Sequence, residues 1–148
     1  MTLVFRVQKE LDKTYLAIDY GSRRIGLAKS DPSGTIASAL VTIEVKSLNE
    51  GVKKVVEVIE KHKPNAVVIG YPLLASGEMS LKCLEVDEFV DKIADLYKGE
   101  IYKVDESWTS AEAQDVIHAH GKRAGKKKAR LDRIAAVIIL QRFLDGEK

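Results

Sequence analysis

The chain has 148 residues, of which 45% are hydrophobic and 31% are charged, as expected for one globular domain with its own core. Its single cysteine, Cys83, excludes an internal disulfide and a cysteine-cluster zinc site, and predicts a reducing, cytoplasmic setting. No apolar run approaches the roughly 20 residues of a membrane span, and the first residues lack the apolar stretch of a signal peptide. We therefore expect no membrane partner.

The net charge of +2 is unevenly distributed. Residues 122–133 contain seven Lys or Arg and one Asp, a local charge of +6. The other residues hold 17 basic and 21 acidic groups, a net charge of −4. A basic segment on an acidic body is typical of proteins that bind polyanions, although most charge runs are solvated loops.

Three strands are predicted first, over residues 14–20, 25–28 and 35–45. Gly21 ends the first strand, and the turn at 31–34 precedes the third. The short connections between them favour antiparallel pairing.

The pattern then changes to helical spacing. Ser47 and Glu50 form a capping box for a helix that ends before Pro64. Residues 66–70 predict a strand buried on both faces. A loop leads to a second helix, whose apolar residues are Leu84, Phe89, Ile93 and Leu96.

The rest of the chain predicts a strand at 101–104, a helix opened by Thr109 and Glu112, a basic loop at 121–130, and a last helix from about Asp132 to Leu144. The order βββ-α-β-α-β-α-α predicts three antiparallel strands followed by two parallel ones, because helical crossovers return strands in parallel. This is the topology of the RNase H-like fold, an α/β fold with a mixed five-stranded sheet and helices on both faces. We expect residues 14–148 to form this domain and residues 1–13 an extension, with an edge strand at 3–7.

Asp19 lies late in a strand that should be central and buried. A carboxylate there costs several kcal/mol unless it is paired, neutralised or bound to a metal. A salt bridge to Arg23 or Arg24 across the turn would explain an acidic residue at this position as well as a functional role does.

Two more acidic positions are candidates. Asp105 and Glu106 end a later strand, and because neighbours on a strand point to opposite faces, only one of them can face Asp19. The sequence does not choose between them. Asp132 heads a stripe of small and apolar residues on the last helix, although stabilisation of the helix dipole would also explain it.

Three carboxylates at one sheet edge would make an oxygen-rich site for Mg²⁺ or Mn²⁺. Next to a basic loop, such a site suits phosphodiester hydrolysis. The lysines and arginines would hold the backbone by charge, without reading sequence. The residues expected to contact nucleic acid are Arg23, Arg24, Lys122, Arg123, Lys126, Lys127, Lys128 and Arg130.

The stretch LAIDYGSRRIGLAKSD resembles the opening motif of the YqgF/RuvX family. VVIGYPL, VDESWTSAEA and LDRIAAVIILQRFLD match further family motifs in the same order, so that the resemblance covers residues 15–145. It implies the RNase H-like fold and acidic metal ligands at Asp19, Glu106 and Asp132. Two positions depart from the family pattern: Ser107 replaces the usual Arg, and Leu74 replaces the usual Asn.

The resemblance implies a metal-dependent nuclease that hydrolyses phosphodiester bonds in 5′-end processing of pre-16S rRNA. A Holliday junction resolvase acting on branched DNA is the close alternative, and would require a homodimer where rRNA trimming requires only a monomer. A non-catalytic RNA-binding module is a further alternative, which Ser107 and Leu74 keep open. A phosphotransferase of the actin type would need two such domains, and one chain of this length supplies one.

Overall fold

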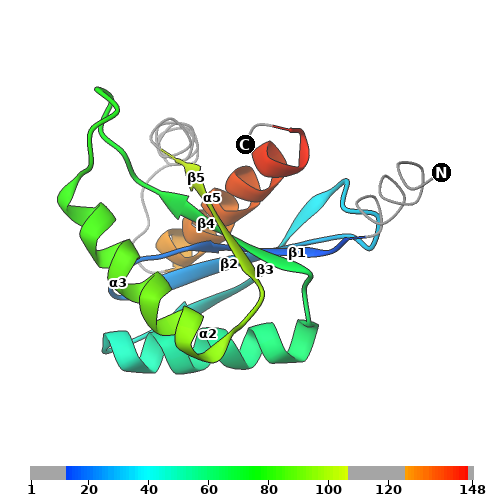
Figure 1. Cartoon of the computed structure of the whole chain (residues 1–148), viewed down its shortest axis with the longest axis horizontal. Helices are drawn as coiled ribbons and strands as arrows, with labels where there is room; N and C mark the ends of the chain where they lie inside the picture. Colours follow the sequence, from blue (N-terminus) through cyan, green and yellow to red (C-terminus); the bar gives the residue numbers. More distant parts are fainter. Residues whose placement is uncertain (1–12, 107–125, 147–148) are drawn as a thin grey trace.

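A computed structural model describes residues 13–106 and 126–146 of the chain, with side chains for 13–106 and 133–146. Five strands form one mixed sheet in the order β3-β2-β1-β4-β5 (Figure 1). Their bounds are β1 Tyr15–Asp19, β2 Arg24–Ser30, β3 Ala37–Glu44, β4 Ala66–Tyr71 and β5 Glu100–Asp105. The first three strands pair antiparallel, and β4 and β5 run parallel to β1. The predicted fold class is confirmed, and the strand limits shift by at most two residues.

Helices cover both faces of this sheet. The helices α2 (Leu48–His62) and α3 (Leu81–Leu96) pack on one face, and α5 (Lys126–Leu144) packs on the other. Figure 1 shows this division, with the sheet between α5 and the α2–α3 pair. No helix in the ranges that the structure describes is long and apolar enough to cross a membrane.

The capping box predicted for α2 is confirmed. Ser47 Oγ accepts a hydrogen bond from the Glu50 N–H at 3.2 Å, and Glu50 Oε1 accepts one from the Lys46 N–H at 2.7 Å. The Ser47 bond satisfies an N–H group in the first turn of the helix, and the Glu50 bond reaches back to Lys46, one residue before the N-cap. At the other end Lys63 adopts a left-handed conformation with φ of 47° and closes the helix before Pro64.

The apolar face of α3 differs from the sequence pattern. Phe89 and Ile93 are buried, as their spacing indicates, but Leu84 and Leu96 are 58% and 62% exposed. Cys83 and Val86 share the buried face instead, where the Cys83 side chain packs as a small apolar residue.

The start of α5 corrects one prediction. The helix begins at Lys126 and not near Asp132, so residues 126–130 are helical where a loop was predicted. Lys, Ala, Arg and Leu all favour helix, and no breaker follows Gly125. Asp132 therefore falls in the second turn of α5. The predicted edge strand at 3–7 and the helix after Thr109 lie outside the described residues.

Candidate active site

Two of the three predicted carboxylates meet at the edge of the sheet where β1 and β5 end. Side chains alternate along a strand, and Ala17 and Val104 both pack in the core beneath α5. Two residues further on, Asp19 and Glu106 therefore extend from the same face of the sheet. Since β4 lies between β1 and β5 and is parallel to both, the carboxyl ends of the three strands share one edge.

Glu106 is the most deeply buried of the described acidic residues, with 3% of its surface exposed. Its backbone N–H donates to the Tyr71 carbonyl at 3.1 Å, which continues the β4–β5 pairing one step beyond the strand. Burial raises the pKa of the Glu106 carboxyl, and the nearby Asp105 carboxylate adds to this rise. A hydrogen bond with Asp19 and the charge of Lys82 act in the opposite direction.

The hydrogen bond between Asp19 and Glu106 has a chemical consequence. Two carboxyl groups in hydrogen-bonding contact cannot both be ionised without strong repulsion, so the pair holds a proton or requires a cation. A site of this kind is a candidate for metal binding.

Gly70 of β4 makes room for the Glu106 carboxyl group. A methyl group built at Gly70 would overlap Glu106 Oε2 and would lie 2.8 Å from Glu106 Cδ and 2.7 Å from Ile139 Cδ1 of α5. A side chain at Gly70 would therefore force the Glu106 carboxyl group and the Ile139 side chain to move, so this glycine makes room for Glu106 in the position that it occupies.

The structure separates Asp105 from Glu106. Asp105 is exposed and lies on the opposite face of β5, together with Lys103. Lys103 Nζ forms an ion pair with Asp87 Oδ1 of α3 at 2.7 Å. Glu106 is thus the member of the pair whose side chain reaches Asp19.

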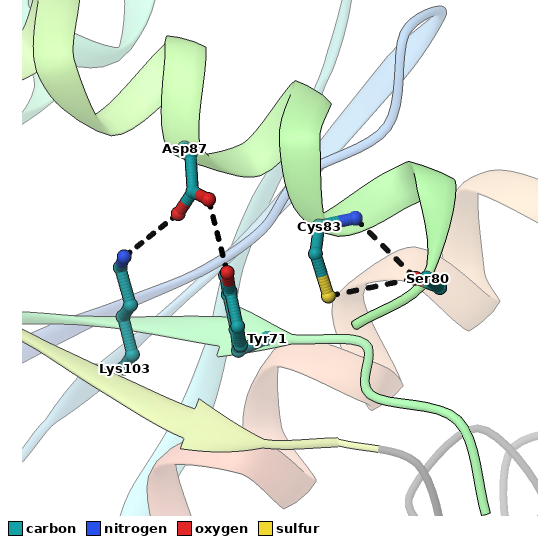
Figure 2. Close-up of polar contacts among 5 residues, drawn as sticks. All are labelled: Tyr71, Ser80, Cys83, Asp87 and Lys103. Atoms are coloured by element: carbon teal, nitrogen blue, oxygen red, sulfur yellow. Dashed lines mark hydrogen bonds and ion pairs between the residues drawn. The ribbon is translucent and has the colours of Figure 1, made fainter. Parts of the chain in front are cut away.

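A polar cluster on the other face of the sheet fastens the ends of β4 and β5 to α3 (Figure 2). Tyr71 Oη donates to Asp87 Oδ2 at 2.9 Å, and Lys103 Nζ lies 4.7 Å from the centroid of the Tyr71 ring. Desolvation, followed by the hydrogen bond to Asp87, raises the pKa of Tyr71 to about 12. The carbonyl of this same Tyr71 accepts the Glu106 N–H, so the cluster supports the strand end that carries Glu106.

The start of α3 is tied to the same region. Ser80 Oγ donates to the Pro72 carbonyl at 2.6 Å. It also accepts from the Cys83 N–H at 3.3 Å (Figure 2). This N-cap fixes the first turn of α3, which carries Lys82. Lys82 and Gly70 were not among the predicted site residues. The glycine that follows the apolar run 66–69 was the available signal for Gly70.

The remaining predicted residues are only partly placed. Arg23 is exposed in the turn before β2, and Arg24 is half-buried as the first residue of β2. The backbone of Asp132 lies in α5 one turn before Ala135 and Ala136, which are buried against the sheet. The side chains of Asp132 and of the basic residues Lys126, Lys127, Lys128 and Arg130 lie outside the described part, as do Lys122, Arg123 and Ser107 entirely. Among the side chains that are described, no three His, Cys, Asp or Glu converge as a metal site.

The position that departs from the family pattern in the β4–α3 loop is on the surface. Leu74 is 49% exposed, and its backbone closes a turn by accepting the Gly77 N–H and donating to the Glu78 carbonyl, both at 2.8 Å. The leucine side chain thus adds apolar surface to this loop, together with the exposed Met79 and Leu81.

Curated proteins similar to this chain cover nearly all of it. A protein of Ruminiclostridium cellulolyticum is 40% identical over 131 residues, which are 88% of this chain and 92% of that protein. A protein of Fusobacterium nucleatum is 36% identical over 138 residues, 92% of this chain and 99% of its own length. Both carry the name "Putative pre-16S rRNA nuclease".

Solved structures share the fold at much lower sequence identity. Thermus thermophilus RuvC in complex with a Holliday junction superposes with a TM-score of 0.59 at 18% identity, covering 90% of this chain and 97% of RuvC. Fowlpox virus resolvase with its junction DNA gives a TM-score of 0.53 at 11% identity, covering 90% and 97%. The family model described as "RuvX: Holliday junction resolvase" matches residues 13–146. The chain therefore belongs to the RuvX family.

Proposed function

We propose that this protein is a metal-dependent nuclease that hydrolyses phosphodiester bonds in pre-16S rRNA during maturation of its 5′ end. The observation that supports this most directly is the hydrogen bond between the half-buried Asp19 and the buried Glu106 at the sheet edge. The names of the similar proteins support the substrate. Together they favour an enzyme over a domain that binds nucleic acid without cutting it.

The donor set fits a hard divalent cation. Asp19 and Glu106 offer carboxylate oxygens in contact with each other, burial raises the pKa of Glu106, and a cation would neutralise the pair. We propose that Asp19, Glu106 and Asp132 hold Mg²⁺ or Mn²⁺, with Asp132 contributed by the second turn of α5. Bound there, the metal would supply an activated water and charge stabilisation for the oxygens of the scissile phosphate.

The residues around the pair would position the reaction. Gly70 keeps the backbone of β4 clear of the Glu106 carboxyl group, and the Tyr71 carbonyl holds the Glu106 N–H. Lys82, whose charge acts on Glu106, is placed to offset negative charge at this edge. Arg23, Arg24 and the basic residues of 122–130 would hold the phosphate backbone on either side.

The second candidate is resolution of branched DNA. The description of the matching family as a Holliday junction resolvase favours it. The proposed contacts involve phosphate and metal, which RNA and DNA share, so the choice requires a direct comparison of substrates.

The test is cleavage of a labelled pre-16S rRNA 5′ fragment and of a four-way DNA junction, side by side. Each is incubated with Mn²⁺, with EDTA, and with the Asp19→Asn variant. Asp91→Asn on the exposed face of α3 serves as the matched control. We expect metal-dependent cutting of the RNA by the parent and by Asp91→Asn, and none by Asp19→Asn. Equal cleavage by Asp19→Asn, or binding without cleavage in Mn²⁺, would contradict the proposal, and cutting of the junction alone would favour the resolvase.

A further inference from the structure

A groove of about 720 Å³ lies beside the β1–β2 turn, outside the carboxyl pair, and of its lining residues only Arg23 and Arg24 have a role in the proposed function. Its volume is within the range of about 300–1,000 Å³ typical of ligand sites. It is lined by the turn before β2, the end of β3 and the first turns of α2, through Ser22, Arg23, Arg24, Glu44, Val45, Lys46, Glu50 and Lys54. We infer that this groove binds the sugar–phosphate backbone of the substrate strand next to the cleavage site; this rests on the proposed function.

The fold brings the two sides of the groove together through specific backbone contacts. The Val45 N–H donates to the Arg23 carbonyl at 2.9 Å, which joins the end of β3 to the turn before β2. The turn is tight because Gly21 lies against Arg24: a Cβ at Gly21 would be 2.6 Å from the Arg24 carbonyl oxygen. Lys46 follows Val45 directly and is therefore held beside Arg23.

The second lysine comes from α2. Lys54 Nζ donates to the Glu44 carbonyl at 3.3 Å, so its side chain extends back from the helix toward the end of β3. An ammonium group has three donors, and this bond uses one of them. Arg23, Lys46 and Lys54 are all exposed, so their charges face a ligand that approaches from solvent.

The charge of the groove fits a polyanion. Four of the lining side chains are basic and two are acidic. One of the two, Glu50, already accepts the Lys46 N–H as part of the helix cap. Ser47 Oγ accepts the Glu50 N–H, so this N–H group at the start of α2 already has a partner. Binding of an anion in the groove would therefore depend on the charged side chains. By contrast, the exposed face of α3 presents Glu85, Glu88, Asp91 and Asp95, which would repel nucleic acid.

The groove is close enough to the carboxyl pair to hold the same strand. Asp19 pairs with Gly26 across the β1–β2 ladder, and Arg24 is two residues further along β2. At about 3.4 Å per residue, Arg24 is roughly 7 Å along the strand from the partner of Asp19. The carboxyl pair lies on the α5 side of the sheet and Lys54 comes from α2 on the other side. A strand with its scissile phosphate at Asp19 and Glu106 would therefore pass Arg24 and cross the end of the sheet to place neighbouring phosphates at the groove. Contacts of this kind fix register without reading sequence.

The experiment measures binding separately from cleavage. The double variant Lys46→Ala/Lys54→Ala is compared with the parent and with Lys53→Ala/Lys61→Ala, which removes two exposed lysines of α2 that lie outside the groove. Fluorescence anisotropy with the labelled pre-16S rRNA fragment and with the four-way DNA junction, in EDTA and from 50 to 200 mM salt, gives the dependence of log K on log salt. We expect the slope to decrease in magnitude by roughly 1.4–1.8 for the groove variant, since each lost phosphate contact accounts for about 0.7–0.9. The RNA concentration for half-maximal cleavage in Mn²⁺ should rise as well.

Lys46→Arg/Lys54→Arg should restore the parent slope, because the charges return, and it controls for misfolding. If the groove variant gave the same slopes as the Lys53/Lys61 control, the proposal that the groove binds the substrate strand would be wrong. This outcome is separable from failure of the proposed function. If the parent cuts RNA and the groove variant has the parent's slope, only the proposal about the groove is wrong. A slope that depends on Lys46 and Lys54 in a parent that cuts neither substrate would leave the groove standing without the nuclease. The probe, RNA or DNA, whose salt slope changes more between the parent and the groove variant identifies the nucleic acid that the groove binds.

Discussion

The carboxyl group of Glu106 fills the volume that a side chain at Gly70 would occupy. Gly70 lies near the end of the central parallel strand β4, and Glu106 follows β5 on the same face of the sheet. Ile139 of α5 closes the third side of this space. The buried position of Glu106 thus depends on the absence of a side chain on the neighbouring strand.

Gly70→Ala should lower both stability and activity. The added methyl group would overlap Glu106 Oε2 and press on Ile139, and overpacking of this kind costs about 1–3 kcal/mol. Displacement of the Glu106 carboxyl group should also reduce RNA cleavage more than the loss of stability explains. The measurements are urea unfolding and the cleavage rate at a temperature where the variant is folded.

A double-mutant cycle tests the cause of this effect. In a Glu106→Ala background the carboxyl group is gone, so Gly70→Ala should cost less free energy of unfolding than it does in the parent. Equal costs in the two backgrounds would show that the clash with Glu106 is not the reason glycine is needed.

Mn²⁺ should stabilise the protein through Asp19 and Glu106. A cation that binds only the folded state at 100 times its dissociation constant adds about 2.7 kcal/mol, a rise in melting temperature of roughly 5–10 °C for a chain of this length. Asp19→Asn should abolish most of the rise, and Asp91→Asn should keep it. Thermal unfolding with and without Mn²⁺ measures this without reference to catalysis. An equal rise in Asp19→Asn would place the metal elsewhere.

Lys82→Ala should weaken cleavage of RNA. The charge of Lys82 opposes the rise in the pKa of Glu106, and its loss would leave the carboxyl pair harder to ionise. We expect the pH at which cleavage reaches half its maximum to move upward, because the pair must be ionised to hold a metal. Lys53→Ala, an exposed lysine of α2, is the control. A pH profile identical to that of the control would exclude this role for Lys82.

The site shows what the sequence could and could not supply. The ends of the predicted strands indicate Asp19 and the Asp105–Glu106 pair, and only the family resemblance favours Glu106 over Asp105. Because side chains alternate along a strand, Asp105 and Glu106 point to opposite faces of the sheet. Only the register of β4 with β5 and the position of Val104 beneath α5 show that Glu106 is the one on the α5 face. Lys82 was missed because its proximity to Glu106 arises from the packing of α3 on the sheet, which has no sequence pattern of its own.

The fold was more predictable than the helix limits. The order of strands and crossovers determines the mixed sheet, because parallel strands need long connections and antiparallel strands do not. The charge of residues 126–130 predicts a loop, but these residues begin α5, because lysine and arginine are also good helix formers. On α3, Leu84 matched the apolar period and is exposed, because the neighbouring Cys83 faces the sheet instead.

Asp87 should contribute stability that disappears in acid. The hydrogen bond from Lys103, with a second from Tyr71, lowers the pKa of Asp87 below its ordinary value, so the ionised form is favoured in the folded protein. Its contribution is therefore present above the pKa of the unfolded chain and is lost as the pH falls through the lower pKa of the folded protein. Asp87→Asn should reduce the free energy of unfolding by about 1 kcal/mol at pH 7, since the pair is partly exposed, and by less at pH 3. Urea unfolding of both proteins at the two pH values measures the difference, with Asp91→Asn as the control. A difference that does not shrink at pH 3 would mean that the ionised state of Asp87 does not stabilise the end of β5.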